Sequence, residues 1–290
     1  MAPSDPPLEI GPPLGESELP QAEALVAEAG WNQTADDWRV FREFGTVYAI
    51  RNSGRVVATA ATLPYGERFA WISMVLVTKT FQRRGIATQL LQRCVDDIVA
   101  NKRVPVLDAT PAGREVYRRM GFEDSWSFQR YNATDVRVSS RAPLSIGTQI
   151  HGITDSIWPR LCAYDARAFG ADRSGLLASL RRRLPQAALY AERDGEVIGF
   201  LLGRDGRIST QLGPLVAEDD ETAIALLAQA FKSINTRVFI DIADARRDTV
   251  DWLSAISFTS QRPLTRMLYR RAQAFDDGRR TYAVVGPEFG

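Results

Sequence analysis

A polar segment that contains a glycine, Gln82–Ala87, has the residue types and spacing of an anion-binding loop. It follows a nearly all-apolar run and opens a segment with an apolar stripe of helical spacing. The small residues Gly85 and Ala87 would let a ligand approach the backbone closely. The first N–H groups of a helix point outward without partners in the helix, and the helix dipole adds partial positive charge there. The pattern therefore predicts a cradle for a pyrophosphate, to which Arg83 and Arg84 add charge.

This loop and a second segment, Leu107–Phe122, together resemble the GCN5-related N-acetyltransferase (GNAT) superfamily. The family's motif for the pyrophosphate of acyl-CoA is matched by Gln82–Ala87. Its later strand-helix unit is matched by Tyr117, four residues before a Gly-Phe pair. The resemblance covers residues 20–131 closely. It implies that acetyl-CoA or another short acyl-CoA is a co-substrate.

The resemblance also implies which residues hold the acyl-CoA. Backbone groups of a strand would pair with the pantetheine arm as an added strand does, and N–H groups of the following loop would hold the pyrophosphate. Thr110 stands where many members carry Asn, and its hydroxyl can still form a hydrogen bond. The residues expected at the cofactor are Val75, Leu76, Val77, Gln82, Arg83, Arg84, Gly85, Ile86, Ala87, Thr88, Thr110 and Gly113.

The resemblance places Tyr117 beside the thioester sulfur, where a phenol suits the chemistry. The departing thiol has a pKa near 8.5, and a tyrosine with a pKa near 10 can share a proton with it or give one to it. The base that takes the proton of the attacking amine stays open, with Ser73 and Asp108 as the nearest polar candidates. Trp31 and Trp38 flank a helix start that lines the acceptor site in this family, although tryptophans there are more often core residues.

The second half repeats the order of elements and resembles the degenerate C-terminal domain of tandem GNAT proteins. At the position of the phosphate loop it carries Ala217–Glu221, whose four acids would repel a pyrophosphate but suit a helix N-terminus. Leu253 stands where the first half has Tyr117. This half should therefore keep the fold without acyl-CoA chemistry, and wall the acceptor pocket or form an interface. The Asp165–Arg173 stretch is a candidate to face that pocket.

The composition describes an ordinary water-soluble chain of 290 residues. It has 36 basic and 35 acidic residues, a net charge of +1, two cysteines and one histidine. This balance disfavours nucleic acid and anionic membranes as partners, and no apolar run approaches the roughly 18 residues that span a bilayer. So few cysteines and histidines argue against a disulfide framework or a metal site and favour a cytoplasmic location.

The expected fold is mixed α/β, with two tandem GNAT-like domains, each a mostly antiparallel sheet flanked by helices. We expect domains at 1–134 and 145–275, a linker within 132–144, and a tail at 276–290 without an element. Ala2–Glu16 is expected to be a leader or a lightly pinned strand. The predicted helices are 20–29, a second one capped by Thr34, one that begins after Gly85, 111–120, 157–169, 176–184, 221–233 and 249–257. The predicted strands are 46–51, 55–63, 69–77, 104–108, 125–131, 187–192, 197–203, 210–216, 238–242 and 263–271.

The sequence favours an N-acetyltransferase that moves an acetyl group to a primary amine by direct attack, since no cysteine or serine is placed as a nucleophile. The acceptor is a small molecule or a peptide, and a homodimer is an open possibility. The alternative is an acyl-CoA-binding sensor or assembly protein without catalysis. Cys94 and Cys162 are interpreted as core residues, His151 as part of a linker, and Arg181–Arg183 as helix-terminal cations.

Overall fold

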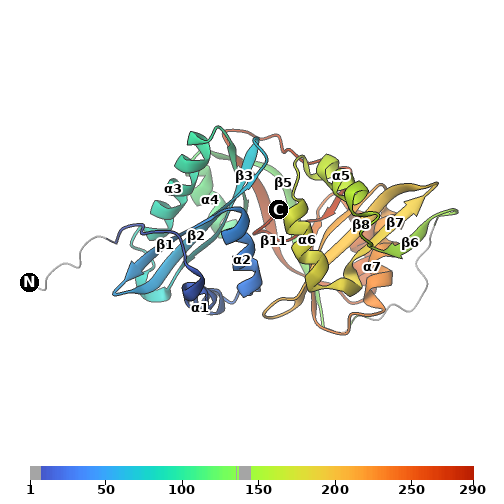
Figure 1. Cartoon of the computed structure of the whole chain (residues 1–290), viewed down its shortest axis with the longest axis horizontal. Coiled ribbons are helices and arrows are strands. Elements are labelled where there is room, and N and C mark those ends of the chain that lie inside the picture. The colour runs from blue at the N-terminus through green and yellow to red at the C-terminus, as the bar shows by residue number, and fades with distance from the viewer. Residues whose placement is uncertain (1–7, 135, 137–144) are drawn as a thin grey trace, which may run out of the picture. The chain divides into compact units, whose positions relative to one another are not determined.

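The computed structural model describes residues 8–134, 136 and 145–290 (Figure 1). Its internal contacts divide the chain into two compact units, Met1–Pro105 and Val106–Gly290. The predicted ranges 1–134 and 145–275 place the division later. Most of the expected linker, and the first residues of the expected leader, lie outside the described residues.

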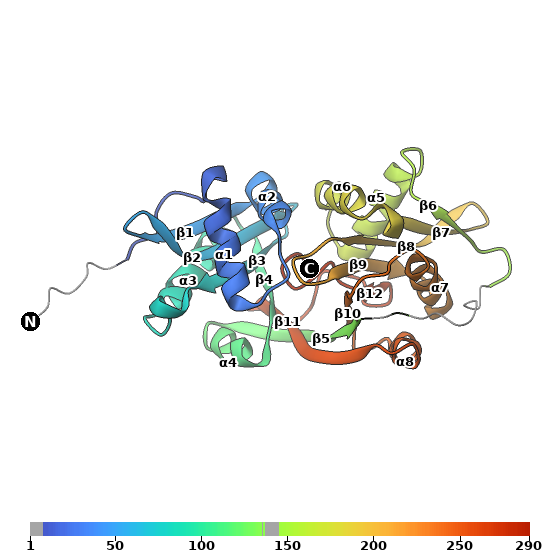
Figure 2. The same ribbon diagram turned by 90° about the horizontal axis from the view of Figure 1, so that it is seen from below.

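The first unit is a three-stranded antiparallel sheet between helices. Neighbouring strands β1 and β2 pair, as do β2 and β3. Helix α3 covers one face of the sheet, and α1 and α2 cover the other (Figure 2). Its elements are η1 (Glu16–Glu18), α1 (Leu19–Ala29), α2 (Ala35–Phe44), β1 (Thr46–Asn52), β2 (Arg55–Tyr65), β3 (Phe69–Val77), η2 (Lys79–Phe81) and α3 (Ile86–Ala100).

Local sequence explains where the elements of the first unit begin and end. Gly30 closes α1 in the left-handed region with φ +70°, and Thr34 caps α2 in a capping box with Asp37. Gly54, with φ +77°, completes the turn between β1 and β2. Helix α3 buries one apolar stripe against the sheet, made by Ile86, Leu90, Leu91, Cys94, Val95 and Ile98.

The second unit begins within β4 (Val104–Ala109), whose residues from Val106 onward belong to it. Helices α5 and α6 cover one face of its sheet and α7 covers the other (Figure 2). The remaining strands are β5 (Phe122–Ala133), β6 (Gln149–Gly152), β7 (Leu189–Arg193), β8 (Glu196–Arg204), β9 (Thr210–Ala217), β10 (Val238–Ala243), β11 (Thr259–Tyr269) and β12 (Thr281–Ala283). The helices are α4 (Pro111–Arg119), α5 (Trp158–Phe169), α6 (Ser174–Arg183), η3 (Pro185–Ala187), α7 (Asp220–Phe231) and α8 (Arg247–Ala255).

The two repeats exchange their last strands within the sheet of the second unit. The strand order there is β4-β11-β5-β10-β12-β9-β8-β7-β6. Strand β11, from the second repeat, pairs with β4 and β5 of the first, and β5 in turn pairs with β10 of the second. This exchange explains why the contacts place β5 with the C-terminal part of the chain.

Most predicted elements are present, and three expectations about the ends of repeats are wrong. The expected tail contains β12, which pairs with β9 and β10. His151 lies in strand β6, not in a linker, and its ring lies 5.3 Å from that of Tyr190. Strand β5 is longer than the predicted 125–131. Strands β6 and β12 have only four and three residues, too few for a periodic signal.

A buried ion pair joins β5 of the first repeat to β10 of the second. Arg130 of β5 donates two hydrogen bonds to Asp241 of β10, at 2.8 and 2.7 Å, and Gln211 donates a third at 3.1 Å. The Arg130 side chain is 6% exposed and that of Asp241 is 0% exposed. Charges this deep are tolerated only when they are paired and hydrogen-bonded.

Replacing Asp241 with Ala should lower the free energy of unfolding by about 3–5 kcal/mol, because the Arg130 guanidinium would stay buried without its partner. Urea unfolding of both proteins measures the difference. Glu115→Ala, which removes an exposed partner of Arg118, is the control and should leave the free energy nearly unchanged. Equal effects of the two changes would contradict this account.

Candidate functional site

Strand β3 carries a β-bulge in its second half. Two of its residues, Met74 and Val75, oppose the single residue Ala60 of β2. Met74 has φ +52°, and the hydroxyl of Thr59 holds its carbonyl at 2.9 Å. A bulge interrupts the ladder and redirects the strand. The bulge therefore changes the direction of the last residues of β3. At Met74 and Val75 the backbone does not form the regular ladder with β2.

The loop after β3 leads into α3 and contains two residues in the left-handed backbone conformation. Arg83 has φ +61°, and Gly85, the N-cap, has φ +79°. A Cβ on Gly85 would meet no atom within 4 Å, so the space in front of it is open. A cavity of about 320 Å³ lies here, lined by Val75, Val77, Phe81, Gln82, Arg83, Gly85, Ile86, Ala87 and Thr88. The first N–H groups of a 15-residue helix border this cavity, so the site fits a pyrophosphate.

The side chains of Gln82 and Arg84 brace the loop. Gln82 Nε2 donates to the carbonyl of Val77 at 3.0 Å, and Arg84 Nη2 donates to the carbonyl of Thr80 at 3.1 Å. The Arg84 guanidinium also lies 4.9 Å from the centre of the Phe81 ring. These bonds close the loop on itself and hold its backbone in place.

Helix α4 positions Tyr117. Thr110 caps the helix, since its Oγ1 accepts the N–H of Gly113 at 3.3 Å. The tyrosine ring lies over Gly113, where a Cβ would come within 2.9 Å of Tyr117 Cε2. The ring of Phe122 lies 6.1 Å away. Burial raises the pKa of Tyr117 above its ordinary value, so the phenol keeps its proton at neutral pH.

Asp108 is bound on both carboxylate oxygens. Arg266 of β11 donates to them at 3.0 and 3.1 Å, and the Asp108 side chain is 0% exposed. Burial raises the pKa of Asp108 to about 6, against the lowering effect of Arg266 and with a further rise from the charge of Asp276. Asp108 is therefore held by a salt bridge inside the unit.

Comparison with known proteins identifies the family. The Acetyltransferase (GNAT) family matches residues 16–122, and a second Acetyltransferase (GNAT) domain matches residues 161–283. The chain belongs to the GNAT superfamily. It carries two GNAT domains in tandem, as the sequence predicts, and it is an acyltransferase of that superfamily.

Similar proteins cover nearly the whole length of this GNAT chain. An uncharacterized N-acetyltransferase of Bacillus subtilis, YitH, is 22% identical over 92% of this chain and 93% of its own. A Pyrococcus horikoshii protein of known crystal structure has a TM-score of 0.76 at 19% identity, over 98% of this chain and 95% of that one. A tandem GNAT protein from the clavulanic acid biosynthesis pathway has a TM-score of 0.66 at 16% identity, over 90% and 98%. These structures share the fold.

The second GNAT domain has an acidic helix start where the first has its loop. Asp219 caps α7, since its Oδ1 accepts the N–H of Thr222 at 2.8 Å, and Arg193 lies 3.3 Å from its other oxygen. Asp220 and Glu221 lie in the first turn of α7, so the prediction that these acids stand at a helix N-terminus is confirmed. Leu253, in the position of Tyr117, is fully buried.

The Asp165–Arg173 stretch forms an internal cluster. Asp165 accepts two hydrogen bonds of 2.9 Å from Arg173, and both side chains are at most 4% exposed. The Arg173 guanidinium lies 3.8 Å from the centre of the Phe169 ring and donates to the carbonyl of Gly290. These contacts give the stretch a packing role within the second unit.

The other residues that the sequence analysis singled out differ in how deeply they are buried. Trp38 is fully buried among core residues, and Trp31 is half-buried. The backbone N–H of Trp31 donates to the carbonyl of Val26 at the end of α1. Ser73 is buried directly before the bulge, and its hydroxyl has no hydrogen-bond partner within the described residues. Cys94 is core as expected, whereas Cys162 is only half-buried. The arginines at the end of α6 form ion pairs, with Asp155 for Arg181 and Asp205 for Arg183.

Sequence reasoning missed three residues that hold the candidate segments in place within their own units. Met74 makes the bulge, Arg266 holds Asp108, and Glu28 contacts the start of the loop. None of them stands in a motif, because a bulge and two long-range contacts leave no local pattern.

The described residues contain neither a membrane-spanning helix nor a group of metal ligands. In the described part of the chain, no helix is long and apolar enough to cross a membrane. Within the same residues, no group of three or more His, Cys, Asp or Glu side chains could hold a metal ion.

Asp108 should titrate with a midpoint near pH 6 in a carboxyl NMR titration of the folded protein. Because this folded pKa lies above the ordinary value of 3.8, the contribution of Asp108 to stability is complete below about pH 4 and is lost as the pH rises through 6. Arg266→Met should raise the midpoint further, since the guanidinium favours the carboxylate. A midpoint near 3.8 in the native protein would contradict the assignment.

Proposed function

We propose that the N-terminal GNAT domain binds acetyl-CoA, or another short acyl-CoA, and transfers the acyl group to a primary amine. The observation that supports this most directly is the left-handed Gly85 at the start of α3, with open space in front of it and the bulged end of β3 beside it. This arrangement offers backbone donors to a diphosphate and a turned strand edge to the pantetheine arm.

Each part of the acyl-CoA would have its own protein partners. Backbone groups of Val75 to Val77 would pair with the amides of the pantetheine arm. The N–H groups of Arg84 to Thr88 would hold the pyrophosphate, and the side chains that brace the loop would keep these donors aligned. When bound, the acyl-CoA would supply a thioester carbonyl carbon that an amine can attack.

The proposed reaction is direct attack in a ternary complex. The amine nitrogen would form a bond to the carbonyl carbon, and the carbon–sulfur bond would break. Tyr117 would give its proton to the departing sulfur, because its phenol is protonated at neutral pH. The amine would lose a proton to Ser73, Asp108 or a water chain, and Thr110 and Gly113 would support the tyrosine. The acceptor is a small-molecule or peptide amine, with Trp31 proposed near it; Trp38, which the sequence also offered, is fully buried in the core.

Acetyl-CoA should raise the melting temperature of the wild type, because a ligand that binds only the native state stabilises it by about 2.7 kcal/mol at a hundred times its dissociation constant. Gly85→Glu should abolish this shift by filling the cradle with a side chain and a negative charge. Gly54→Glu is a matched control, with φ +77° and equally open space, and should keep the shift. A wild type that shows no shift with any acyl-CoA would overturn the proposal.

Tyr117→Phe should lower kcat by about a hundredfold, since it removes the proton donor and keeps the ring. Free-thiol release with a panel of primary amines measures the rate. Tyr269→Phe, whose ring lies 5.5 Å from Phe122, is the control and should leave kcat unchanged. Binding of acyl-CoA without transfer to any amine would instead favour a sensor or assembly protein.

A further inference from the structure

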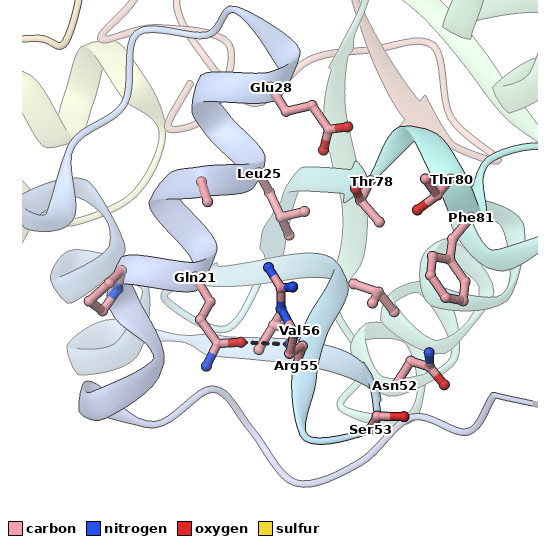
Figure 3. A pocket seen from close by; sticks show the side chains of 13 residues that line it. Gln21, Leu25, Glu28, Asn52, Ser53, Arg55, Val56, Thr78, Thr80 and Phe81 are labelled. Carbon is pink, nitrogen blue, oxygen red and sulfur yellow. Dashed lines mark hydrogen bonds between the residues drawn. The ribbon is translucent and has the colours of Figure 1, made fainter.

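A cavity of about 550 Å³ lies behind the segment that leads into the phosphate loop (Figure 3). Residues of α1, among them Gln21, Leu25 and Glu28, form one wall, and the residues Thr78, Thr80 and Phe81 form another. On this side the segment after β3 is backed by open space instead of packed side chains. Its position therefore depends on a few directional contacts.

Glu28 makes two of those contacts from across the cavity. Its Oε1 accepts the N–H of Lys79 at 2.9 Å, and its carboxylate also accepts the hydroxyl of Thr78. The N–H of Lys79 and the Thr78 hydroxyl hold the pKa of Glu28 below its ordinary value, so the acceptor is charged at neutral pH. Hydrogen bonds to a charged group are stronger than neutral ones. The other anchor is the N–H of Thr78, which donates to the carbonyl of Val57 at 2.9 Å.

Phe81 connects this anchor to the ligand-binding side. The short helix η2 runs from Lys79 to Phe81, and the Phe81 ring lines both the 550 Å³ cavity and the 320 Å³ cavity at the start of α3. Arg84 lies over the same ring. A displacement of Lys79 would therefore move a wall of the cavity that Gly85 borders.

We propose that Glu28 is a positioning residue for the phosphate loop. From α1 it fixes Thr78 and Lys79, and so sets where η2 ends and how the N–H groups of Arg84 to Thr88 face the ligand. Its role toward acyl-CoA rests on the function proposed above. Its effect on the loop exists without ligand and can be measured separately.

Gln21 supplies a matched control from the same helix and the same cavity. Its Oε1 accepts the N–H of Val56 in β2 at 2.8 Å. This bond also joins α1 to the sheet, and Figure 3 shows it at the end of the cavity away from Thr78 and Phe81. Removing it should loosen α1 without releasing the loop.

Glu28→Ala should raise the dissociation constant for acetyl-CoA about tenfold, as expected for loss of a hydrogen bond to a charged group. Isothermal titration calorimetry measures this constant. Gln21→Ala should leave it within about twofold of the wild-type value even where the two variants lose the same stability. Glu28→Gln should restore most of the affinity, because an amide oxygen can still accept both hydrogen bonds. In steady-state assays, Glu28→Ala should raise the KM for acetyl-CoA and leave kcat at saturation unchanged.

Amide hydrogen exchange without ligand gives an independent readout. The Lys79 amide should exchange at least tenfold faster in Glu28→Ala than in the wild type, and at the wild-type rate in Gln21→Ala. Equal losses of affinity in the two alanine variants, or unchanged exchange at Lys79, would overturn the proposal. If the wild type binds no acyl-CoA, the proposed function fails. Faster exchange of the Lys79 amide in Glu28→Ala would still show that Glu28 positions the start of the loop.

Discussion

The connection from β3 to α3 must turn a buried strand into a helix while leaving open space at the first N–H groups of that helix. This constraint explains the unusual backbone on both sides of the turn. Met74 and Arg83 adopt left-handed conformations that non-glycine residues rarely take, and Gly85 supplies the third. Such strain persists only where surrounding contacts fix it. Here Thr59 holds Met74, Gln82 and Arg84 close the loop, and Glu28 anchors its start.

The second unit buries several charged side chains, two pairs in its sheet and one pair between helices. Arg130 and Asp241, Arg173 and Asp165, and Arg266 and Asp108 are paired with little or no exposure. Replacing such pairs with apolar residues is often neutral or stabilising, so they are weak evidence for stability. Two of them, Arg130–Asp241 and Arg266–Asp108, join residues that lie directly opposite each other in neighbouring strands, so these pairs match the register of those strands. Both pairs involve a strand that is exchanged between the repeats, β5 in one case and β11 in the other.

The two GNAT domains show that one fold can carry opposite charges at the same place. In the first, Gly85 leaves the helix N-terminus open to an anion. In the second, Asp219 occupies the N-terminus of α7 with its own carboxylate. The N-terminal end of the helix dipole is thus left open in one domain and is occupied by a side chain of the chain itself in the other. Function follows from the residue at the cap and not from the architecture.

The sequence by itself determined the helices, most strands, the loop at Gln82–Ala87 and the loss of that loop in the second half, because these depend on periodicity, caps and glycine positions within a few residues. Tertiary structure alone decided the rest. The bulge at Met74 depends on pairing with β2, and the partners of Asp108 and Lys79 stand 158 and 51 residues away. The short strands β6 and β12 form because neighbouring strands pair with them, β7 with β6 and both β9 and β10 with β12. Such contacts leave no local pattern, since their free energy comes from groups that only the folded chain brings together.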